Sequence, residues 1–423
     1  MGKNGGAART REREVPESEK EVAVLAEQFD VVILGGGPGG YAAALYGAAA
    51  GLHIAMVENQ RVGGTCLHRG CIPAKELLQT AEVLRTVAGA KEFGVDAGQP
   101  TLDLSTSQAR KQQVVDRLTK GLEGLLKKRK VTVVAGTGSV IDAEARYVRV
   151  SDGTELRGEA LVLATGSLPR SLPGMNFDGR RILSSDDVLV LDEVPARVAI
   201  IGGGAIGCEF ASMLSDYGSD VTVLEALPEI LPGVDPDASK VVARSFKKRG
   251  IKVHTAAVVT GVTGDAELTV AFTVDKKPQE AVVDRVILSV GRRPRSEGIG
   301  LEDSGVEVDG RGFVVVDEHL RTSVPGVYAV GDLVAGPQLA HVGFAEAIVA
   351  IKTILGEDVA PIAYDKVPWG IYCHPEVSFC GLTEELRRPR TRDVHAEQRP
   401  VALGDELHDP HRLADDERAS VAG

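Results

Sequence analysis

Two stretches of the chain share one order of apolar, glycine-rich and helical segments. Residues 29–34 form a short apolar run typical of a buried strand, followed by the glycine-rich segment 35–40 and an alanine-rich helical stretch. A second apolar run, 53–57, ends at Glu58. This order predicts a β–α–β unit whose strands are parallel and buried.

The same order returns in the middle of the chain. An apolar run at 197–201 precedes the glycine-rich segment 202–207, a helical stretch and a further apolar run at 220–224, which ends at Glu225. Two copies in matching settings are harder to explain as ordinary glycine-rich turns than one copy would be. We therefore predict an α/β protein with two doubly wound, Rossmann-like units.

Both glycine-rich segments have the G-x-G-x-x-G spacing of a dinucleotide-binding turn. In the first, Gly35 permits a tight turn, Gly37 lets the backbone approach a pyrophosphate, and Gly40 lets helix and strand pack closely. The second copy has its glycines at the same three places, Gly202, Gly204 and Gly207. We expect each turn to hold phosphates at the positive N-terminus of its helix.

The acid that ends each second strand indicates which nucleotide each unit binds. Glu58 and Glu225 both fall where a ribose hydroxyl would be bound. A carboxylate at position 225 favours the 2′-hydroxyl of NAD(H) and repels the 2′-phosphate of NADP(H). The residues that follow, 226–228, offer no compensating arginine.

Length and charge narrow the class of protein. A chain of 423 residues with 43% hydrophobic content can form two or three domains, and a net charge of -12 argues against general affinity for nucleic acid or anionic membranes. Residues 1–28 lack the apolar core of a secretory signal, and the alanine-rich stretch 41–56 is interrupted by glycines. We predict a cytoplasmic protein without a nucleic-acid or membrane partner.

Two of the five cysteines, Cys66 and Cys71, lie five positions apart just after the first dinucleotide signature. On a regular helix their Cα atoms would be roughly 8 to 9 Å apart, whereas a disulfide requires less than about 7 Å. Gly70 can supply the local distortion that closes this gap. The context favours a redox-active disulfide; buried free thiols, or half a zinc site with His68 as third ligand, remain open alternatives.

The segment 63–75, Gly-Gly-Thr-Cys-Leu-His-Arg-Gly-Cys-Ile-Pro-Ala-Lys, resembles the active-site segment of the pyridine nucleotide-disulfide oxidoreductases. Within this family, dihydrolipoamide dehydrogenases are the most similar group. Residues 164–166, 291–294 and 322–332 match further family landmarks, and the likeness runs from about Phe29 to Glu384. The resemblance implies an enzyme that uses FAD and NAD.

The resemblance also implies an electron path. Cys66 would exchange with the dithiol of dihydrolipoamide or a lipoyl domain, Cys71 would face the flavin as a thiolate, and electrons would pass through FAD to NAD+. The alternative within the family is another flavin disulfide or metal-ion reductase. Glu225 argues against its NADPH-using members, and the absence of a C-terminal cysteine pair argues against a mercuric reductase.

By resemblance, Lys75 lies near the flavin ring and pairs with Glu209, while Asp332 holds the ribityl chain. Taken alone, Lys75 and Glu209 could form an ordinary surface ion pair, and Asp332 could cap a strand. The other residues expected to contact a cofactor are Gly138, Thr165, Gly166, Ser167, Gly291, Gln338, Leu339, Ala340 and His341.

The family pattern divides the chain into domains. Residues 29–165 and 290–363 would form the FAD-binding domain, with the NAD-binding domain at 166–289 inserted between them. Residues 364–385 would begin an α+β dimerisation domain that is incomplete here. We expect residues 1–28 and the polar segment 386–423 to be disordered.

The sequence departs from the family pattern near its C-terminus. Family members carry a His-Pro-x-x-x-x-Glu element whose histidine serves thiol exchange in the partner subunit, and this sequence lacks it. His374 matches an earlier His-Pro-Glu segment and is predicted to be structural, while His408 and His411 receive no role. A truncated or frame-altered chain is therefore predicted. In that case the family homodimer is doubtful, and a lipoamide-inactive flavoprotein with residual NADH diaphorase activity is the alternative function.

Overall fold

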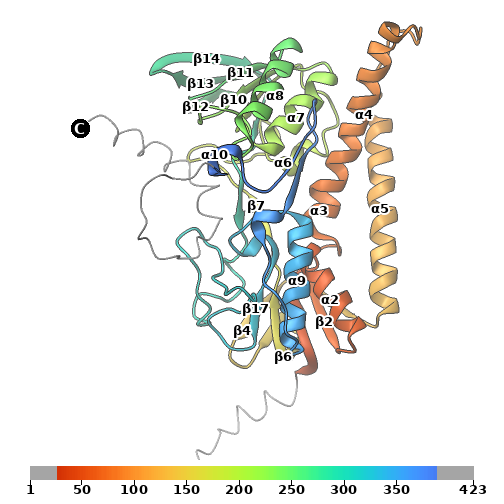
Figure 1. Cartoon of the computed structure of the whole chain (residues 1–423), viewed down its shortest axis with the longest axis vertical. Helices are drawn as coiled ribbons and strands as arrows, with labels where there is room; N and C mark the ends of the chain where they lie inside the picture. Colours follow the sequence, from red (N-terminus) through yellow and green to blue (C-terminus); the bar gives the residue numbers. More distant parts are fainter. Residues whose placement is uncertain (1–25, 388–423) are drawn as a thin grey trace, which may run out of the picture.

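The computed structural model describes residues 26–387 (Figure 1). His408, His411 and nearly all of the two segments expected to be disordered lie outside the described residues. Within residues 26–387, two α/β units lie one above the other, the first with a mixed sheet and the second with a parallel one, and the chain passes from the first to the second and back.

The first unit contains a seven-stranded sheet of order β3-β2-β1-β6-β5-β4, with β17 paired to β6. The predicted strands of the first unit are present as β1 and β2, which pair in parallel. Strand β17, from much later in the chain, joins the carboxyl half of β6 in parallel. The strands are β1 (Glu27–Leu34), β2 (Ile54–Glu58), β3 (Thr132–Ala135), β4 (Gly138–Asp142), β5 (Tyr147–Val150), β6 (Glu155–Leu163) and β17 (Val327–Ala329).

Helices from both ends of the described chain pack on this sheet. Helix α2 (Pro38–Ala49) follows the first glycine-rich turn and packs against α9 (Ala340–Ile354). The short helix α3 (Gly64–Arg69) leads into the long helix α4 (Cys71–Gly89), which ends in the 3-10 turn η1 (Ala90–Phe93). Helix α5 (Leu104–Lys128) packs beside α4, and α4 reaches from the first unit to α7 of the second (Figure 1).

The second unit has a five-stranded parallel sheet of order β11-β10-β9-β15-β8. Strands β9 (Arg197–Ile201) and β10 (Asp220–Leu224) confirm the two strands predicted for this unit. The other strands are β8 (Ile182–Leu183), β11 (Lys252–His254) and β15 (Arg285–Leu288), and the helices are α6 (Ser185–Val188), α7 (Ala205–Asp216) and α8 (Pro236–Lys248). An antiparallel sheet of β12 (Ala257–Gly264), β13 (Leu268–Val274) and β14 (Lys277–Val283) follows.

Two short antiparallel strand pairs lie outside these sheets. One connects the two units, and the other forms a hairpin in the segment that follows residue 364. Strand β7 (Ser167–Pro169) leaves the first unit and pairs antiparallel with β16 (Arg292–Pro294), which returns to it. This ladder agrees with the expected insertion, although the domain boundaries themselves stay a prediction. After the 3-10 turns η2 (Gly331–Leu333) and η3 (Tyr364–Lys366), strands β18 (Pro368–Ile371) and β19 (Val377–Cys380) form a hairpin, and α10 (Glu384–Arg387) ends the described chain.

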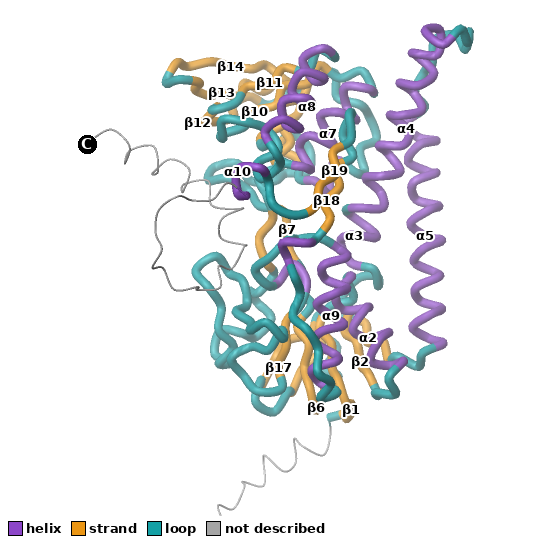
Figure 2. Tube along the Cα trace, in the orientation of Figure 1, coloured by secondary structure: helices purple, strands orange, loops and turns teal. Residues whose placement is uncertain are grey.

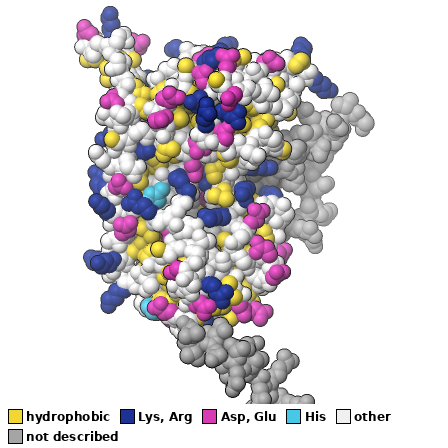
Figure 3. Space-filling model, turned by 180° about the vertical axis from the view of Figure 1, so that it is seen from behind, with side chains coloured by type: hydrophobic (Ala, Val, Ile, Leu, Met, Phe, Trp, Pro, Cys, Tyr) yellow, Lys and Arg dark blue, Asp and Glu magenta, His cyan; other side chains and the backbone are white. Residues whose placement is uncertain are grey.

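Buried side chains from both sheets form the cores. Apolar residues of β1, β2, β6 and β17 are buried on both faces of the first sheet, as expected of a sheet covered by helices. Among residues 26–387 no helix is long and apolar enough to cross a bilayer. On the face shown in Figure 3, cationic and anionic side chains are interspersed, so this face presents no large patch of one sign.

Candidate active site

A cleft of about 2260 Å³ runs along the carboxyl ends of the parallel strands of both units. Ligands of open α/β sheets bind at this edge, and the cleft exceeds the size that one small molecule needs. It is lined by the two predicted catalytic residues, Cys66 and Cys71, and by most of the residues predicted to bind cofactors: Gly35, Gly37, Glu58, Lys75, Gly138, Thr165, Gly166, Ser167, Gly202, Gly204, Glu225, Gly291, Asp332, Gln338, Leu339 and Ala340.

The glycines of the first turn have different surroundings, which agree with the different roles predicted for them. Gly35 has φ +107°, and a Cβ atom there would lie 2.2 Å from the carbonyl oxygen of Ala164. A Cβ atom on Gly40 would lie 1.8 Å from the carbonyl oxygen of Gly35, so this position requires glycine for packing. At Gly37 the nearest atom to such a Cβ is 3.9 Å away, so this backbone is open to the cleft. The second turn repeats the pattern at Gly202, Gly204 and Gly207.

Both strand-end acids bond back to their own glycine-rich turn. Glu58 Oε2 accepts the backbone N–H of Gly36 at 2.8 Å, and Glu225 Oε2 accepts that of Gly203 at 2.5 Å. The other oxygen of Glu225 accepts the N–H of Leu227 at 2.8 Å. These bonds fix each carboxylate in the cleft, and each oxygen retains a lone pair for a ribose hydroxyl.

Unsatisfied polar groups in the cleft fit two dinucleotides. Helices α2, α7 and α9 all begin at the cleft without a side-chain cap, so their first N–H groups can donate hydrogen bonds to an anionic or carbonyl oxygen of a ligand. The buried Nε2 atom of Gln338 has no hydrogen-bond partner among the described residues. An amide donor left unpaired at a cleft edge is expected where a ligand supplies the acceptor.

Asp332 is held in the first unit by a residue of the crossover. Its Oδ2 accepts the hydroxyl of Ser167 at 2.6 Å, and Arg292 Nε donates to the same hydroxyl oxygen at 2.7 Å. Arg292 Nη2 also donates to the Ser167 carbonyl at 3.0 Å. The two strands of the crossover ladder therefore orient the carboxylate that we expect to bind the ribityl chain.

The two cysteines lie on either side of a helix break. Helix α3 ends at Arg69 and α4 begins at Cys71, so Gly70 interrupts what would otherwise be one helix. Both sulfurs are thiols here, and the Cys66 thiol donates a hydrogen bond to the sulfur of Cys71. The break at Gly70 agrees with the local distortion predicted there, while disulfide formation stays a prediction.

The two sulfurs differ sharply in acidity. The hydrogen bond from Cys66, together with the positive charge of Lys75, lowers the pKa of Cys71 to about 7, although burial opposes this. Donating that hydrogen bond and burial both raise the pKa of Cys66. Burial and the nearby cysteines raise the pKa of Tyr41 to about 12. Near neutral pH, a substantial fraction of Cys71 is therefore thiolate, while Cys66 stays a thiol.

The predicted pair of Lys75 and Glu209 is confirmed. Lys75 Nζ lies 3.0 Å from Glu209 Oε1 and 3.1 Å from Oε2, joining α4 of the first unit to α7 of the second. The pair is not an ordinary surface ion pair, because Glu209 is buried.

The histidines near the cleft have structural contacts. His341 is exposed, and its ring donates from Nε2 to the carbonyl of Pro368 at 2.9 Å. It does not line the cleft with the other residues expected to contact a cofactor, and its contact with the flavin stays a prediction. His68 Nε2 contacts the carbonyl of Val62 at 2.9 Å, and residues 26–387 contain no cluster of three metal-ligating side chains.

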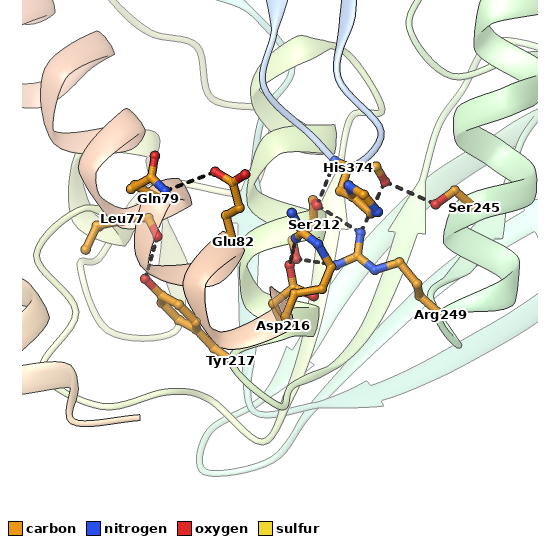
Figure 4. A network of polar contacts seen from close by, with 10 residues as sticks. Leu77, Gln79, Glu82, Ser212, Asp216, Tyr217, Ser245, Arg249 and His374 are labelled. Atoms are coloured by element: carbon orange, nitrogen blue, oxygen red, sulfur yellow. Dashed lines mark hydrogen bonds and ion pairs between the residues drawn. The ribbon is translucent and has the colours of Figure 1, made fainter. Parts of the chain in front are cut away.

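His374 belongs to a polar network between the second unit and the β18–β19 hairpin (Figure 4). Its backbone N–H donates to Ser212 Oγ at 3.0 Å, and its carbonyl accepts from Ser245 at 3.2 Å and Arg249 at 3.3 Å. Arg249 also pairs with Asp216 at 2.8 Å. These contacts agree with the structural role predicted for His374.

Comparison with known proteins identifies the family. The family model described as pyridine nucleotide-disulphide oxidoreductase matches residues 29–347. The chain belongs to this family. A dihydrolipoyl dehydrogenase from Chlamydia pneumoniae is 40% identical over 359 residues, covering 85% of this chain and 77% of the relative. One from Bacillus subtilis is 39% identical over 397 residues, covering 90% and 84%.

Solved structures of related proteins share the fold. LpdA of Mycobacterium tuberculosis matches with a TM-score of 0.78 and 28% identity, over 85% of this chain and 79% of that one. The HOCl-induced flavoprotein disulfide reductase RclA of Escherichia coli matches with a TM-score of 0.75 and 29% identity, over 86% and 80%. The chain is thus an oxidoreductase of the lipoamide dehydrogenase-like group of flavoprotein disulfide oxidoreductases, and FAD and NAD(H) are the cofactors of this family.

The sequence interpretation missed three residues that shape the site. Arg292 orients Ser167 and Asp332. The carboxylate of Glu346 accepts a hydrogen bond from Gly331, which precedes Asp332. The ring of Tyr372 contacts Lys75. Two of them carried a signal: Glu346 is the only acidic residue of the mostly apolar helix α9, and Arg292 lies in the family landmark 291–294. Tyr372 reaches the site from a distant segment.

Proposed function

We propose that the chain oxidises dihydrolipoamide and passes the electrons through Cys66, Cys71 and FAD to NAD+. The observation that carries this proposal is the polarised thiol pair, with Cys71 beside Lys75 and Cys66 as its hydrogen-bond donor. This pair lines the same cleft as two dinucleotide-binding turns. The relatives named dihydrolipoyl dehydrogenase support this choice of substrate.

The chemistry begins with the Cys66–Cys71 disulfide. A thiolate of the substrate attacks Cys66 Sγ, the disulfide breaks, and Cys71 leaves as a thiolate. The second substrate thiol then displaces Cys66, so the substrate becomes a disulfide and the cysteine pair gains two electrons. Lys75 stabilises the departing thiolate, and Cys66 receives a proton and donates its hydrogen bond to Cys71.

Bound FAD supplies two-electron transfer between the thiols and a nicotinamide. The chain's contribution to that step is to orient both dinucleotides and to hold Cys71 as the electron donor. The negative charge of the Glu225 carboxylate, fixed by Gly203 and Leu227, favours NAD+ over NADP+.

The test uses the purified chain supplied with FAD and reduced by dihydrolipoamide. We expect a long-wavelength absorption band from the Cys71 thiolate beside the oxidised flavin. Cys71→Ser should remove the band while FAD remains bound, and Cys380→Ser is the matched control because Cys380 is exposed and outside the cysteine pair. A chain that takes up no FAD, or a band that survives Cys71→Ser, contradicts the proposal.

A second candidate function is NADH diaphorase activity with little turnover of dihydrolipoamide. It is favoured by the lack of a His-Pro-x-x-x-x-Glu element in this sequence and by the structural contacts of His374. Without a positioned acid and base, thiol exchange should slow by about 10²- to 10⁴-fold, whereas reduction of an artificial acceptor by NADH does not need it. The two candidates are separated by comparing how fast the 423-residue chain turns over dihydrolipoamide with how fast it reduces an artificial acceptor with NADH. The oligomeric state of the same sample is measured as well. Lipoyl domains as substrates and a cytoplasmic location stay predictions.

A further inference from the structure

The β18–β19 hairpin places an aromatic ring on the lysine of the site. The hairpin lies against α7 (Figure 2), and the ring of Tyr372, just after β18, has Lys75 Nζ 4.7 Å from its centroid. At this distance the face of an aromatic ring attracts an ammonium group. The same side chain is 46% exposed, so burial of apolar area does not explain its position.

The backbone of Tyr372 contacts the partner of that lysine. Its N–H donates to Glu209 Oε1 at 3.0 Å, the same oxygen that lies 3.0 Å from Lys75 Nζ. One residue of the hairpin therefore contacts both members of the ion pair. With the carboxylate on one side and the ring on another, the ammonium group has little freedom to turn away from the cysteines.

The charge of Lys75 acts on Cys71. The titratable groups that influence Cys71 come from three elements: Cys66 on α3, Lys75 on α4 and Glu209 on α7. Tyr41 on α2 also lies near the pair, and the two cysteines help to raise its pKa. Cys66 donates a hydrogen bond and Lys75 supplies positive charge, whereas Glu209 opposes the thiolate. Any change in the position of Lys75 relative to Glu209 therefore changes how well the thiolate is stabilised.

We propose that Tyr372 is a positioning residue that holds Lys75 beside Cys71, so that the β18–β19 hairpin helps to keep Cys71 a thiolate. This inference deepens the proposed function and rests on it. Strands β18 and β19, which are expected to begin a dimerisation domain, would then also position a residue of the active site in their own chain.

The experiment measures the acidity of Cys71 directly. The purified, FAD-loaded chain is reduced with a phosphine and alkylated with iodoacetamide across a range of pH, and the modified peptides are quantified after trypsin digestion. Cleavage after Arg61, Arg69 and Lys75 places Cys66 in the peptide 62–69 and Cys71 in the peptide 70–75, so each thiol is followed separately.

We expect Tyr372→Leu to raise the apparent pKa of Cys71 by about 0.5 to 1 unit and to slow its alkylation at pH 7 by about 2- to 5-fold. Tyr372→Phe keeps the ring and should behave like the unmodified chain. Phe379→Leu is the matched control, because Phe379 stacks on Trp369 in the same hairpin at 5.7 Å between ring centroids. It should leave the pH profile of Cys71 unchanged.

The possible failures are distinguishable. If Cys71 of the unmodified chain titrates like an ordinary thiol, the proposed function loses its supporting observation. If that thiol is acidic but Tyr372→Leu leaves its profile unchanged, only the inference fails. Equal shifts in Tyr372→Leu and Phe379→Leu would also overturn it, because the effect would then belong to the hairpin as a whole. Bound FAD, measured by its absorbance, confirms that each variant is folded.

Discussion

Glu225 lies directly after β10, and both of its carboxylate oxygens accept backbone N–H groups. The side chain is buried and therefore has a fixed position in the cleft. Glu58, the last residue of β2, occupies the corresponding place in the first unit. A residue of this type is readable from sequence, because its position follows from the strand, the glycine-rich turn and the spacing between them.

The choice of nicotinamide dinucleotide should depend on Glu225. Replacing it with alanine should reduce the preference for NADH over NADPH by about 1 to 3 kcal/mol, the scale of one charge-assisted hydrogen bond. The ratio of kcat/KM values for the two nucleotides, with an artificial acceptor, measures the effect. Glu225→Gln keeps the shape of the side chain and removes only its negative charge, so it measures the contribution of the charge alone. Equal kcat/KM values for NADH and NADPH in the unmodified chain would contradict the assignment of Glu225 as the residue that selects NADH.

At the scale of the element, the first glycine-rich turn and α2 form one unit with two different constraints. Gly40 touches the backbone of Gly35, so its lack of a side chain serves the packing of helix against strand. Gly37 is the N-cap of α2 and faces the cleft, so its lack of a side chain serves a ligand. The motif alone does not separate these two roles.

Alanine substitutions should separate them experimentally. Gly40→Ala forces an overlap with the Gly35 carbonyl and should lower the free energy of unfolding by about 1 to 3 kcal/mol or more. Gly37→Ala meets only the Cα atom of Gly64, at an unstrained 3.9 Å, so it should leave that free energy nearly unchanged while weakening FAD binding at least about 10-fold. Denaturant unfolding of the apoprotein and FAD titration measure the two effects.

Gly204→Ala is the matched variant in the second unit, since nothing lies within 4 Å of its added Cβ atom. It should weaken NADH binding and leave FAD binding unchanged. Equal losses of FAD affinity in Gly37→Ala and Gly204→Ala would show that the two turns do not bind different nucleotides.

At the scale of the whole molecule, Glu346 ties together three separate segments of the described chain. From α9 it accepts the N–H of Gly331 at 2.5 Å and the hydroxyl of Tyr364 at 2.9 Å. The side chain is only 1% exposed. Burial, with a further contribution from Asp332, raises its pKa to about 7 from an ordinary value of 4.5.

This shift predicts a pH dependence of stability. A carboxyl group whose pKa is raised by folding contributes its full stability below its unfolded value of 4.5, and loses it as the pH rises through about 7. Glu346→Gln stays neutral at every pH. The difference in unfolding free energy between Glu346→Gln and the unmodified chain should therefore grow by on the order of 3 kcal/mol between pH 4.5 and pH 8. Parallel denaturation profiles across this range would contradict the prediction.

The sequence by itself determined the elements and chemistry that depend on local order. Strands β9 and β10, the two glycine-rich turns and the acids after them follow from short-range patterns, because periodicity and glycine placement act within a few residues. The cysteine pair is local for the same reason. Family resemblance added the pairing of Lys75 with Glu209, which local pattern could not supply.

Only the tertiary structure decided which distant side chains complete the site. Tyr372 reaches Lys75 because the β18–β19 hairpin packs on α7, and Arg292 reaches Asp332 because β16 pairs with β7. The ring of His341 turns to Pro368 for the same reason: its direction depends on what packs beside α9. Such contacts join residues far apart along the chain, and their free energy depends on the packed geometry of several elements together, which no local sequence pattern specifies.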